Sequence, residues 1–326
     1  MVATLRCTYS TVSADELLTT VVPDYRIDDP VDCRFWQRGA NDTYRVRCAR
    51  AEYFLRLYRH GAYPREANEF EAEALDYLHG RGVPVAHPVE RRSGGFLTEI
   101  AAPEGSRFVL LTTAAEGSEP DYDSLDTCRL VGESVARMHS GFDGFRTTRR
   151  RTRLDLQGLL ESPLVVIRRF LAEHPDRLEL IETVARDVRA AIRAVPEASL
   201  DTGVVHGDLH GGNVHVHEGT VRHFDFEECA FGYRSYDLGT WKWGNALGTD
   251  ERAVRRWQAF LEGYETARPI AEPGRSLVDA FVLVRELSEL AYGIRHVRDF
   301  GYGDIMASDP DFVCGRIEAM REKLDA

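Results

Sequence analysis

Two carboxylates and a carboxamide lie close together in the stretch 206–227. Asp208 and Asn213 belong to the run His-Gly-Asp-Leu-His-Gly-Gly-Asn, which starts at residue 206, and Asp225 follows in the run Asp-Phe-Glu. Magnesium prefers oxygen ligands, and proteins usually supply one or two carboxylates and let substrate phosphates complete the shell. Asn213 and Asp225 are therefore our candidate ligands, and the stretch predicts a magnesium-nucleotide site.

The residues between Asn213 and Asp225 predict a hairpin that would bring both side chains together. Residues 214–217 alternate apolar and polar, as a half-buried strand does, and Glu218-Gly219 is typical of a two-residue turn. The stretch 206–223 also holds five histidines, so a site for a transition metal is an alternative. We instead interpret three of them as the solvated face of a strand: His215, His217 and His223.

Asp208 and Asn213 have the Asp-x-x-x-x-Asn spacing of the kinase catalytic loop, in which the Asp accepts the proton of the attacking hydroxyl. With the downstream Asp-Phe-Glu in the matching order, the sequence resembles the aminoglycoside phosphotransferase and choline kinase family. This family is the small-molecule branch of the protein-kinase-like fold, and in it His-Gly-Asp replaces His-Arg-Asp. The resemblance covers roughly residues 35 to 295 and implies ATP and Mg²⁺ as cofactors.

The resemblance also implies an α+β, bilobal protein-kinase-like fold, with a small β-rich N-terminal lobe and a larger, mainly helical C-terminal lobe. A chain of 326 residues exceeds the usual size of a single core, which agrees with two lobes. We predict a nucleotide-clamping lobe over residues 1–113, and a catalytic and acceptor-binding lobe over residues 114–326.

The segment 37–46 has turn-forming residues between two extended runs, which predicts a hairpin loop that covers phosphates with backbone N–H groups. Gly39 and Asn41 are our candidate nucleotide contacts in this loop. By resemblance, Arg56 in the next strand takes the place of the lysine that grips the α- and β-phosphates. A guanidinium can bind phosphate bidentately but is not equivalent to an ammonium. The alternative is that Arg56 is an exposed strand residue.

A helix is predicted over residues 66–78, from its apolar spacing and the glycines beyond its end. Within it, Glu71 matches the family position of the acid that pairs with the strand cation. Glu69 and Glu73 are close competitors, and all three could instead be solvated acids on the helix face.

The run 108–117 predicts a buried strand that ends in a polar break, like the family's hinge. By that resemblance Thr113 offers its carbonyl to the adenine and Ala115 offers its N–H. His210 occupies the position of a lysine in protein kinases and is our candidate phosphate contact. Asp237 takes the family's architectural role, in which an acid accepts hydrogen bonds that rigidify the catalytic loop.

The chain beyond the hinge predicts helices, the first of them over 127–140, where His139 reads as a core residue. Further helices are expected over 154–172 and 178–195. In the last hundred residues, Glu286 and Glu289 lie three apart and could receive an ammonium group. We prefer to interpret them as acids on an exposed helix face.

The net charge of −12 argues against nonspecific binding to nucleic acid, which depends on basic residues, and it is compatible with a cationic acceptor. No run approaches the roughly 20 apolar residues of a membrane span, and the first residues lack the apolar core of a signal peptide. The six cysteines are scattered without a Cys-x-x-Cys pair. These features predict a cytoplasmic protein with reduced thiols and no membrane partner.

The sequence thus predicts a kinase that moves the γ-phosphate of ATP to a hydroxyl of a small molecule, with an antibiotic or other natural product first among the acceptors. A kinase of Ser/Thr in a peptide or protein is one alternative. A catalytically silent nucleotide-binding pseudokinase is another, because Arg56 replaces the usual lysine and the glycine loop is incomplete. The retained Asp208, Asn213 and Asp225 argue against a silent domain.

Overall fold

A computed structural model describes residues 5–248, 250–300 and 309–325 of the chain. The chain forms two compact units, each assembled from several segments of sequence. Unit 1 comprises residues 1–118, 144–151 and 215–227, and unit 2 comprises 119–143, 152–214 and 228–326. The predicted division at residue 113 into two functional lobes stays a prediction.

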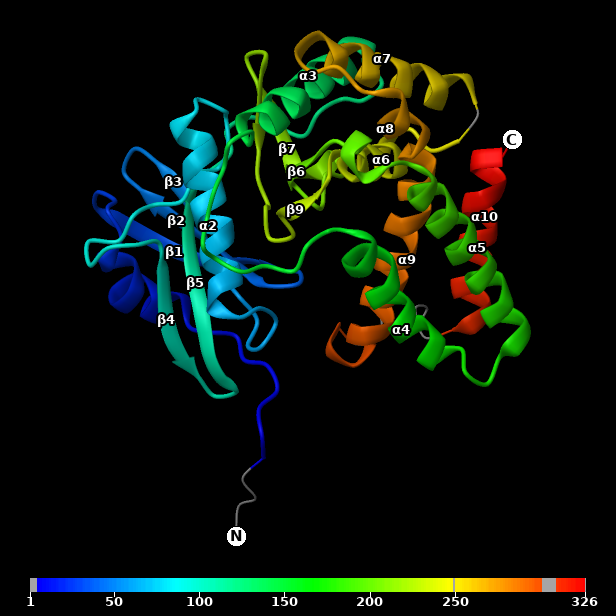
Figure 1. Cartoon of the computed structure of the whole chain (residues 1–326). Helices are drawn as coiled ribbons and strands as arrows, with labels where there is room; N and C mark the ends of the chain where they lie inside the picture. The colour runs from blue at the N-terminus through cyan, green and yellow to red at the C-terminus, as the bar shows by residue number, and fades with distance from the viewer. Residues whose placement is uncertain (1–4, 249, 301–308, 326) are drawn as a thin grey trace. The chain divides into compact units, whose positions relative to one another are not determined.

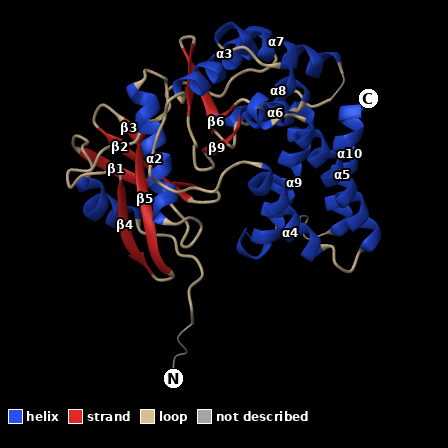
Figure 2. Ribbon diagram, in the orientation of Figure 1, coloured by secondary structure: helices blue, strands red, loops and turns tan. Residues whose placement is uncertain are grey.

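Unit 1 is built around a five-stranded antiparallel sheet with the order β1-β2-β3-β5-β4 (Figures 1 and 2). A short helical segment precedes it, formed by α1 (Ala14–Glu16), η1 (Leu17–Val21) and η2 (Val22–Asp24). The strands are β1 (Pro30–Arg38), β2 (Asp42–Cys48), β3 (Glu52–Leu57), β4 (Leu97–Ala102) and β5 (Gly105–Thr113). The predicted hairpin between residues 37 and 46 is confirmed, because Arg38 pairs with Asp42 at its closed end.

Helix α2 (Arg65–Gly80) confirms the helix predicted over residues 66–78 and lies beside the sheet (Figure 1). Its apolar positions recur every three or four residues, so one stripe of the helix is buried. Ala72 of this stripe packs with Leu97 and Leu110 of the sheet. The opposite side of the sheet buries a second cluster with Tyr44, Val46, Leu55 and Leu111 at its centre.

The hairpin of β7 (Val214–His217) and β8 (Thr220–His223) confirms the two-residue turn predicted at Glu218-Gly219. Both turn residues have positive φ, +47° and +75°, as a type I′ hairpin turn requires. The prediction of a solvated histidine face was wrong for His223, which is fully buried. Its backbone N–H donates to the Pro84 carbonyl and its carbonyl accepts from Ala86, so the loop before β4 covers it.

Unit 2 is mainly helical and also contains the short antiparallel pair β6 (Thr202–Val205) and β9 (Ala230–Tyr233). Its main cluster of buried residues is built by α4 (Ser162–Phe170), α5 (Pro175–Ala194), α6 (Arg234–Asn245), α9 (Val278–Phe300) and α10 (Pro310–Asp325). The remaining elements are α3 (Leu125–Gly141), η3 (Gln157–Glu161), η4 (Glu197–Ser199), η5 (Gly211–Asn213), α7 (Glu251–Ala267) and α8 (Glu272–Ser276). The α+β class and the small N-terminal antiparallel sheet agree with the prediction.

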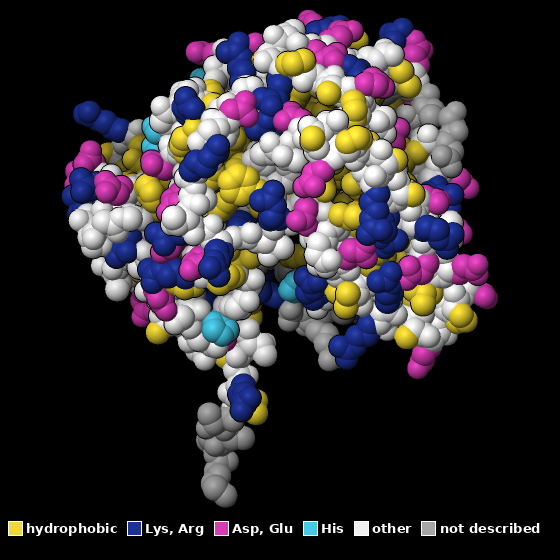
Figure 3. Space-filling view, in the orientation of Figure 1, with side chains coloured by type: hydrophobic (Ala, Val, Ile, Leu, Met, Phe, Trp, Pro, Cys, Tyr) yellow, Lys and Arg dark blue, Asp and Glu magenta, His cyan; other side chains and the backbone are white. Residues whose placement is uncertain are grey.

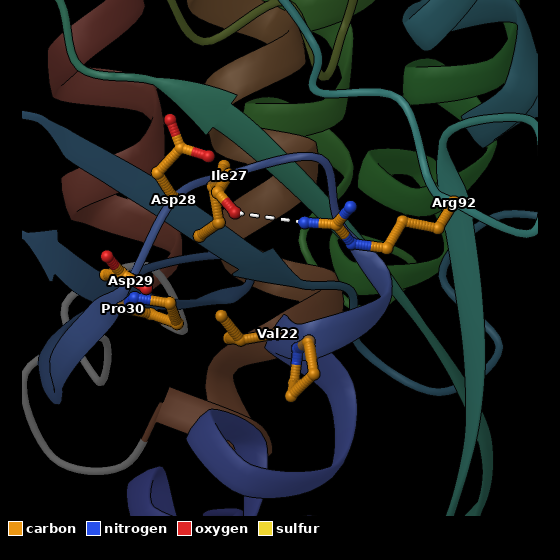
Figure 4. A pocket seen from close by; sticks show the side chains of 7 residues that line it. Val22, Ile27, Asp28, Asp29, Pro30 and Arg92 are labelled. Atoms are coloured by element: carbon orange, nitrogen blue, oxygen red, sulfur yellow. Dashed lines mark hydrogen bonds between the residues drawn. The ribbon is translucent and has the colours of Figure 1, made fainter.

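The surface drawn in Figure 3 carries basic and acidic side chains interspersed with each other. Among the described residues, no helix is both long and apolar enough to cross a membrane. A cavity in unit 1 is lined by Val22, Ile27, Asp28, Asp29 and Arg92, with Arg92 Nη2 donating to the Ile27 carbonyl at 3.2 Å (Figure 4). None of the residues that line it is a predicted site residue.

Candidate active site

Arg56 is the centre of a charged cluster in unit 1. It lies on β3, and its Nη1 donates to Glu71 Oε1 while its Nη2 donates to Asp225 Oδ1, both at 2.6 Å. Tyr58, two residues further along the chain, donates its hydroxyl to the other oxygen of Glu71 at 2.8 Å. The structure therefore selects Glu71 as the partner of the strand cation, and the alternative of an exposed strand arginine is wrong.

The competing acids on α2 have other partners. Glu73 accepts from Thr147 and Arg149, and Glu69 pairs with Arg65. Glu71 itself is buried, which an acid tolerates only when it is paired and hydrogen-bonded. Position on the helix explains the difference, because Glu71 lies on the buried stripe of α2.

The neighbouring carboxylates keep the Arg56 guanidinium protonated. Burial alone would lower the pKa of Arg56, but the carboxylates of Asp225 and Glu71 outweigh this effect and raise it well above its usual value. Asp225 has the left-handed backbone conformation, with φ +64°, which is uncommon outside glycine. Aspartate is one of the non-glycine residues that adopt this conformation most often.

Glu227 joins this cluster and was missed by the sequence analysis. Its Oε2 accepts a hydrogen bond from Asn41 Nδ2, and lies 3.9 Å from Arg56 Nε. Asn41 is buried at the end of the β1–β2 loop, and its Oδ1 accepts from the backbone N–H of Arg59 at 2.8 Å. Asn41 thus ties its loop to neighbouring backbone, while Gly39 donates its N–H to the Asn41 carbonyl at 3.0 Å.

The strand predicted within residues 108–117 is confirmed as β5, which ends at Thr113, and its role as a hinge stays a prediction. The N–H of Thr113 donates to the His87 carbonyl at 3.0 Å, and the hydroxyl lies 3.2 Å from His87 Nδ1. The carbonyl of Ala115 lies 2.8 Å from His215 Nδ1, so this histidine contacts the segment that follows β5 and is only partly exposed to solvent. The adenine contacts assigned to Thr113 and Ala115 stay predictions.

Asp208 is the centre of a second charged cluster, in unit 2. Asn213 Nδ2 donates both to the Asp208 carbonyl at 2.8 Å and to Asp208 Oδ2 at 3.1 Å. His210 Nε2 lies 3.7 Å from the same oxygen. Burial alone would raise the pKa of Asp208, but Arg285, with smaller effects from His210 and His206, lowers it below its usual value. Asp208 is therefore a carboxylate at neutral pH.

Asp237 holds the loop that carries Asp208 through hydrogen bonds to its backbone. This acid is fully buried on α6 and accepts from the backbone N–H groups of His206, at 2.7 Å, and Gly207, at 2.9 Å. His139 Nε2 lies 2.9 Å from Asp237 Oδ2, and its Nδ1 lies 2.8 Å from the Tyr264 hydroxyl. The architectural role of Asp237 and the core position of His139 are both confirmed.

The structure explains why position 207 of the His-Gly-Asp run is a glycine. Its φ is +85°, and a Cβ built on it would lie 2.4 Å from the Glu228 carbonyl oxygen. Only glycine satisfies both conditions. Glycine at position 207 therefore lets the backbone before Asp208 pack against the backbone of Glu228.

Arg285 on α9 is the main functional candidate that the sequence analysis missed. Its Nη2 donates to Asp208 Oδ1, so both oxygens of this carboxylate are engaged. The prediction of exposed acids was wrong for Glu286, which is fully buried and accepts from Trp243 Nε1 at 2.8 Å and Arg316 Nη2 at 2.9 Å. No local sequence pattern predicts these contacts, because the partners are separated by 30 to 77 residues in the sequence.

The predicted metal ligands are Asn213 in unit 2 and Asp225 in unit 1. Within residues 5–248, 250–300 and 309–325, no group of three or more His, Cys, Asp or Glu side chains is arranged to hold a metal by itself. Across the same ranges, the Oδ1 atom of Asn213 and the Oδ2 atom of Asp225 accept no hydrogen bond. Each of these oxygens, taken by itself, is a hard donor of the kind that Mg²⁺ accepts beside phosphates and water.

Arg56 paired with an acid on the following helix, and Asp208 held by Asn213, are the arrangements expected from the resemblance to kinases. Residues 33–270 match the model of the family described as "Phosphotransferase enzyme family". The chain belongs to this family, which confirms the predicted resemblance, the fold and the class of enzyme: a kinase with an alcohol group as acceptor.

Relatives and solved structures agree with this assignment. An uncharacterised protein of Synechocystis sp. is 32% identical over 264 residues, covering 80% of this chain and 73% of its own. A homoserine kinase of Rhodospirillum rubrum is 27% identical over 269 residues, covering 81% and 80%. The structure of a microcompartment-associated aminopropanol kinase superposes with a TM-score of 0.77 at 19% identity, covering 95% of this chain and 98% of that one. The chain is thus similar to small-molecule kinases along most of its length.

Proposed function

We propose that the protein is an ATP-dependent kinase that transfers the γ-phosphate to a hydroxyl of a small molecule. The observation that carries the proposal is the fixed geometry of Asp208, whose carboxylate is ionised, partly exposed and held by Asn213. A carboxylate in this state can accept the proton of an attacking hydroxyl. Family membership makes phosphate transfer the chemistry that such a carboxylate serves.

Asn213 and Asp225 are the proposed ligands of Mg²⁺. Support comes from their free oxygens and from chain order, since Asn213 directly precedes β7 and Asp225 follows β8 by two residues. The bound ion would neutralise charge on the β- and γ-phosphates during transfer. The left-handed backbone of Asp225 agrees with a residue selected for the direction of its carboxylate.

The remaining predicted residues take supporting roles in the proposal. Arg56, held by Glu71, contacts the α- and β-phosphates, and the backbone of the loop at Gly39 and Asn41 covers the phosphates. The hinge at Thr113 and Ala115 holds the adenine by backbone groups. His210, whose Nε2 lies 3.7 Å from Asp208 Oδ2, contacts the transferring phosphate.

In the proposed reaction the acceptor hydroxyl loses its proton to Asp208 while its oxygen forms a bond to the γ-phosphorus. The bond between the γ-phosphorus and the bridging oxygen breaks, and ADP leaves with the electron pair. Positioning and charge neutralisation provide most of the catalysis in this reaction class.

The acceptor is a small molecule, with an antibiotic or other natural product as the first candidate. The kinase relatives also include enzymes named for homoserine and for aminopropanol, which supports screening amino alcohols and hydroxy amino acids in the same panel. Each of these molecules carries a hydroxyl that Asp208 could deprotonate.

The test is incubation of the purified protein with Mg²⁺, γ-labelled ATP and a panel of hydroxyl acceptors, followed by detection of ADP and of labelled product. We expect slow ATP hydrolysis without an acceptor and fast, acceptor-dependent ADP release with the correct one. A melting shift with ATP and Mg²⁺ but no turnover with any acceptor would favour the silent nucleotide-binding domain instead. Label transferred to a peptide and to no small molecule would favour the protein kinase.

A further inference from the structure

Residues 145–151 form a segment that runs along helix α2, and we call this segment the strap. It lies in unit 1, although residues 119–143 before it and 152–214 after it belong to unit 2. Alternate residues of the strap, 145, 147, 149 and 151, contact α2 or the residues just before it, and the residues between them are exposed. An extended chain points successive side chains to opposite sides, so one side of the strap faces α2.

The strap and α2 run in opposite directions and stay in step. Phe145 packs edge-on against Tyr77, near the end of α2, with ring centroids 5.2 Å apart. At the other end of the strap, Arg151 donates from Nη1 to the carbonyl of Ala67, in the first turn of α2, at 2.8 Å. Two extended residues advance about 6.6 Å, and four helical residues advance about 6 Å. Every second residue of the strap therefore meets the next turn of the helix.

Two acids on α2 receive the central contacts of the strap. Glu73 accepts from the Thr147 hydroxyl at 2.5 Å and from Arg149 Nε at 2.9 Å. Arg149 Nη1 also lies 2.8 Å from Oε2 of Glu69, one turn earlier on the helix. Like charges four residues apart destabilise a helix. Arg149 therefore neutralises two acids that would otherwise repel each other.

These contacts hold the side of α2 that lies opposite Glu71. Residues two apart on a helix point about 200° apart, so Glu69 and Glu73 face away from Glu71. On the sheet side, Glu71 accepts from Arg56 at 2.6 Å and from Tyr58 at 2.8 Å. Helix α2 is thus held from both sides, and its displacement would separate Glu71 from Arg56.

We propose that Thr147 and Arg149 are positioning residues, which keep α2 where Glu71 orients Arg56 for the phosphates of ATP. They act through Glu71 and touch no substrate. The inference rests on the proposed function, because that function assigns Arg56 to the α- and β-phosphates. If the strap is loosened, Glu71 contacts Arg56 in only a fraction of the molecules, and the apparent affinity for the nucleotide falls in proportion to that fraction.

The first experiment measures binding of a non-hydrolysable ATP analogue with Mg²⁺ by calorimetric titration. We expect Arg149→Gln and Thr147→Val to raise Kd by roughly 3- to 10-fold. Arg149→Lys should keep part of the affinity, because an ammonium group can still pair with one of the two acids. Unchanged binding by folded Arg149→Gln and Thr147→Val proteins would overturn the inference.

The strap itself provides the matched controls. Arg150→Gln and Thr148→Val make the same chemical changes at exposed positions directly beside the tested residues. Both variants should keep the wild-type Kd. If they weakened binding as much as Arg149→Gln and Thr147→Val, the contacts with α2 would not be the cause.

The second experiment repeats Arg149→Gln in a Glu71→Gln background and separates positioning from a general loss of stability. If Arg149 acts through Glu71, its replacement should have little further effect on Kd once Glu71 is already replaced. A residue that only stabilises the fold would change the free energy of unfolding and leave the Kd of the folded protein unchanged. Equal losses of affinity in both backgrounds would overturn the inference.

Hydrogen exchange distinguishes failure of the inference from failure of the proposed function. Without nucleotide, Arg149→Gln should accelerate exchange of the α2 backbone amides, and Arg150→Gln should not. A wild-type protein that binds no ATP analogue would overturn the proposed function, and the positioning role with it. A wild-type protein that binds the analogue and turns over ATP, while Arg149→Gln shows neither faster exchange nor weaker binding, would overturn the positioning role alone.

Discussion

At the scale of the residue, Asp208 has the most direct consequence for activity. We expect Asp208→Asn to reduce acceptor-dependent turnover by roughly 10²- to 10⁴-fold, because an amide cannot accept the proton of the attacking hydroxyl. Nucleotide affinity should stay close to that of the wild type, since the acid is assigned to the acceptor and not to the phosphates. Steady-state kinetics and calorimetric titration with a non-hydrolysable ATP analogue measure the two effects separately.

Asp187→Asn is the matched control, because Asp187 is an exposed aspartate in the same unit. This variant should keep wild-type kinetics. Wild-type turnover by Asp208→Asn would show that another group receives the proton.

The pairing of Arg56 with Glu71 predicts a coupling in stability. Arg56→Met leaves the buried Glu71 carboxylate without its cation, so the free energy of unfolding should fall by about 3 kcal/mol. Adding Glu71→Gln removes the unpaired charge of the Glu71 carboxylate. The double variant should therefore recover part of the lost free energy of unfolding. Chemical denaturation of the two single variants and the double variant gives the interaction energy, and additive losses would contradict the pairing.

Residues of the local motifs were predictable, whereas their distant partners were not. Asp208, Asn213 and Asp225 stand out because their types and spacing lie within one short stretch of sequence. Arg285, Arg316 and the burial of Glu286 follow from packing among α6, α9 and α10, which no local spacing encodes. His223 was misjudged for the same reason, since the segment that covers it lies far back in the chain.

At the scale of the element, helices α3 and α7 approach so closely that glycine is required at the contact. A Cβ on Gly263 would lie 1.9 Å from the Arg129 carbonyl oxygen, and one on Gly132 would lie 2.0 Å from the Phe260 carbonyl oxygen. Both obstacles are backbone atoms, so the helices must separate to admit a methyl group. We expect Gly263→Ala to lower the free energy of unfolding by roughly 1–3 kcal/mol.

Gly315→Ala on α10 is the comparison, because a Cβ there meets nothing within 4 Å. It should be neutral or slightly stabilising, since alanine favours helix more than glycine does. Thermal or urea denaturation of both variants tests the difference, and equal effects would show that α3 and α7 can separate without cost.

The elements themselves were largely predictable from periodicity and turn residues. The apolar stripe of α2 and the Glu218-Gly219 turn each have a local signal that the structure confirms. The close contact of α3 and α7 had none, because a glycine within a helical pattern does not reveal which backbone it will meet.

At the scale of the whole molecule, the buried network behind the catalytic loop makes stability depend on pH. His139 is fully buried, and burial lowers its pKa below the usual 6.5 despite the opposing effect of Asp237. Tyr264, Arg234 and Asp201 are the other titratable or charged groups near it.

The sign of the pH dependence follows from the direction of this shift. Below about pH 6.5 the unfolded chain binds a proton at His139 that the folded protein resists, so acidification lowers the free energy of the unfolded state relative to that of the folded state. The contribution of neutral His139 is complete above pH 6.5 and is lost progressively below it, with a slope of at most about 1.4 kcal/mol per pH unit.

Urea denaturation of the wild type and of His139→Gln between pH 8 and pH 5 measures this contribution. We expect His139→Gln to be less stable at pH 8, because it disturbs the contact with Asp237, and to lose less stability than the wild type on acidification. His87, whose pKa is also lowered by burial, adds a slope of the same sign to both proteins and cancels in the comparison. His217→Gln at an exposed position should keep the wild-type slope. Parallel curves for His139→Gln and the wild type would show that His139 does not resist protonation in the folded protein.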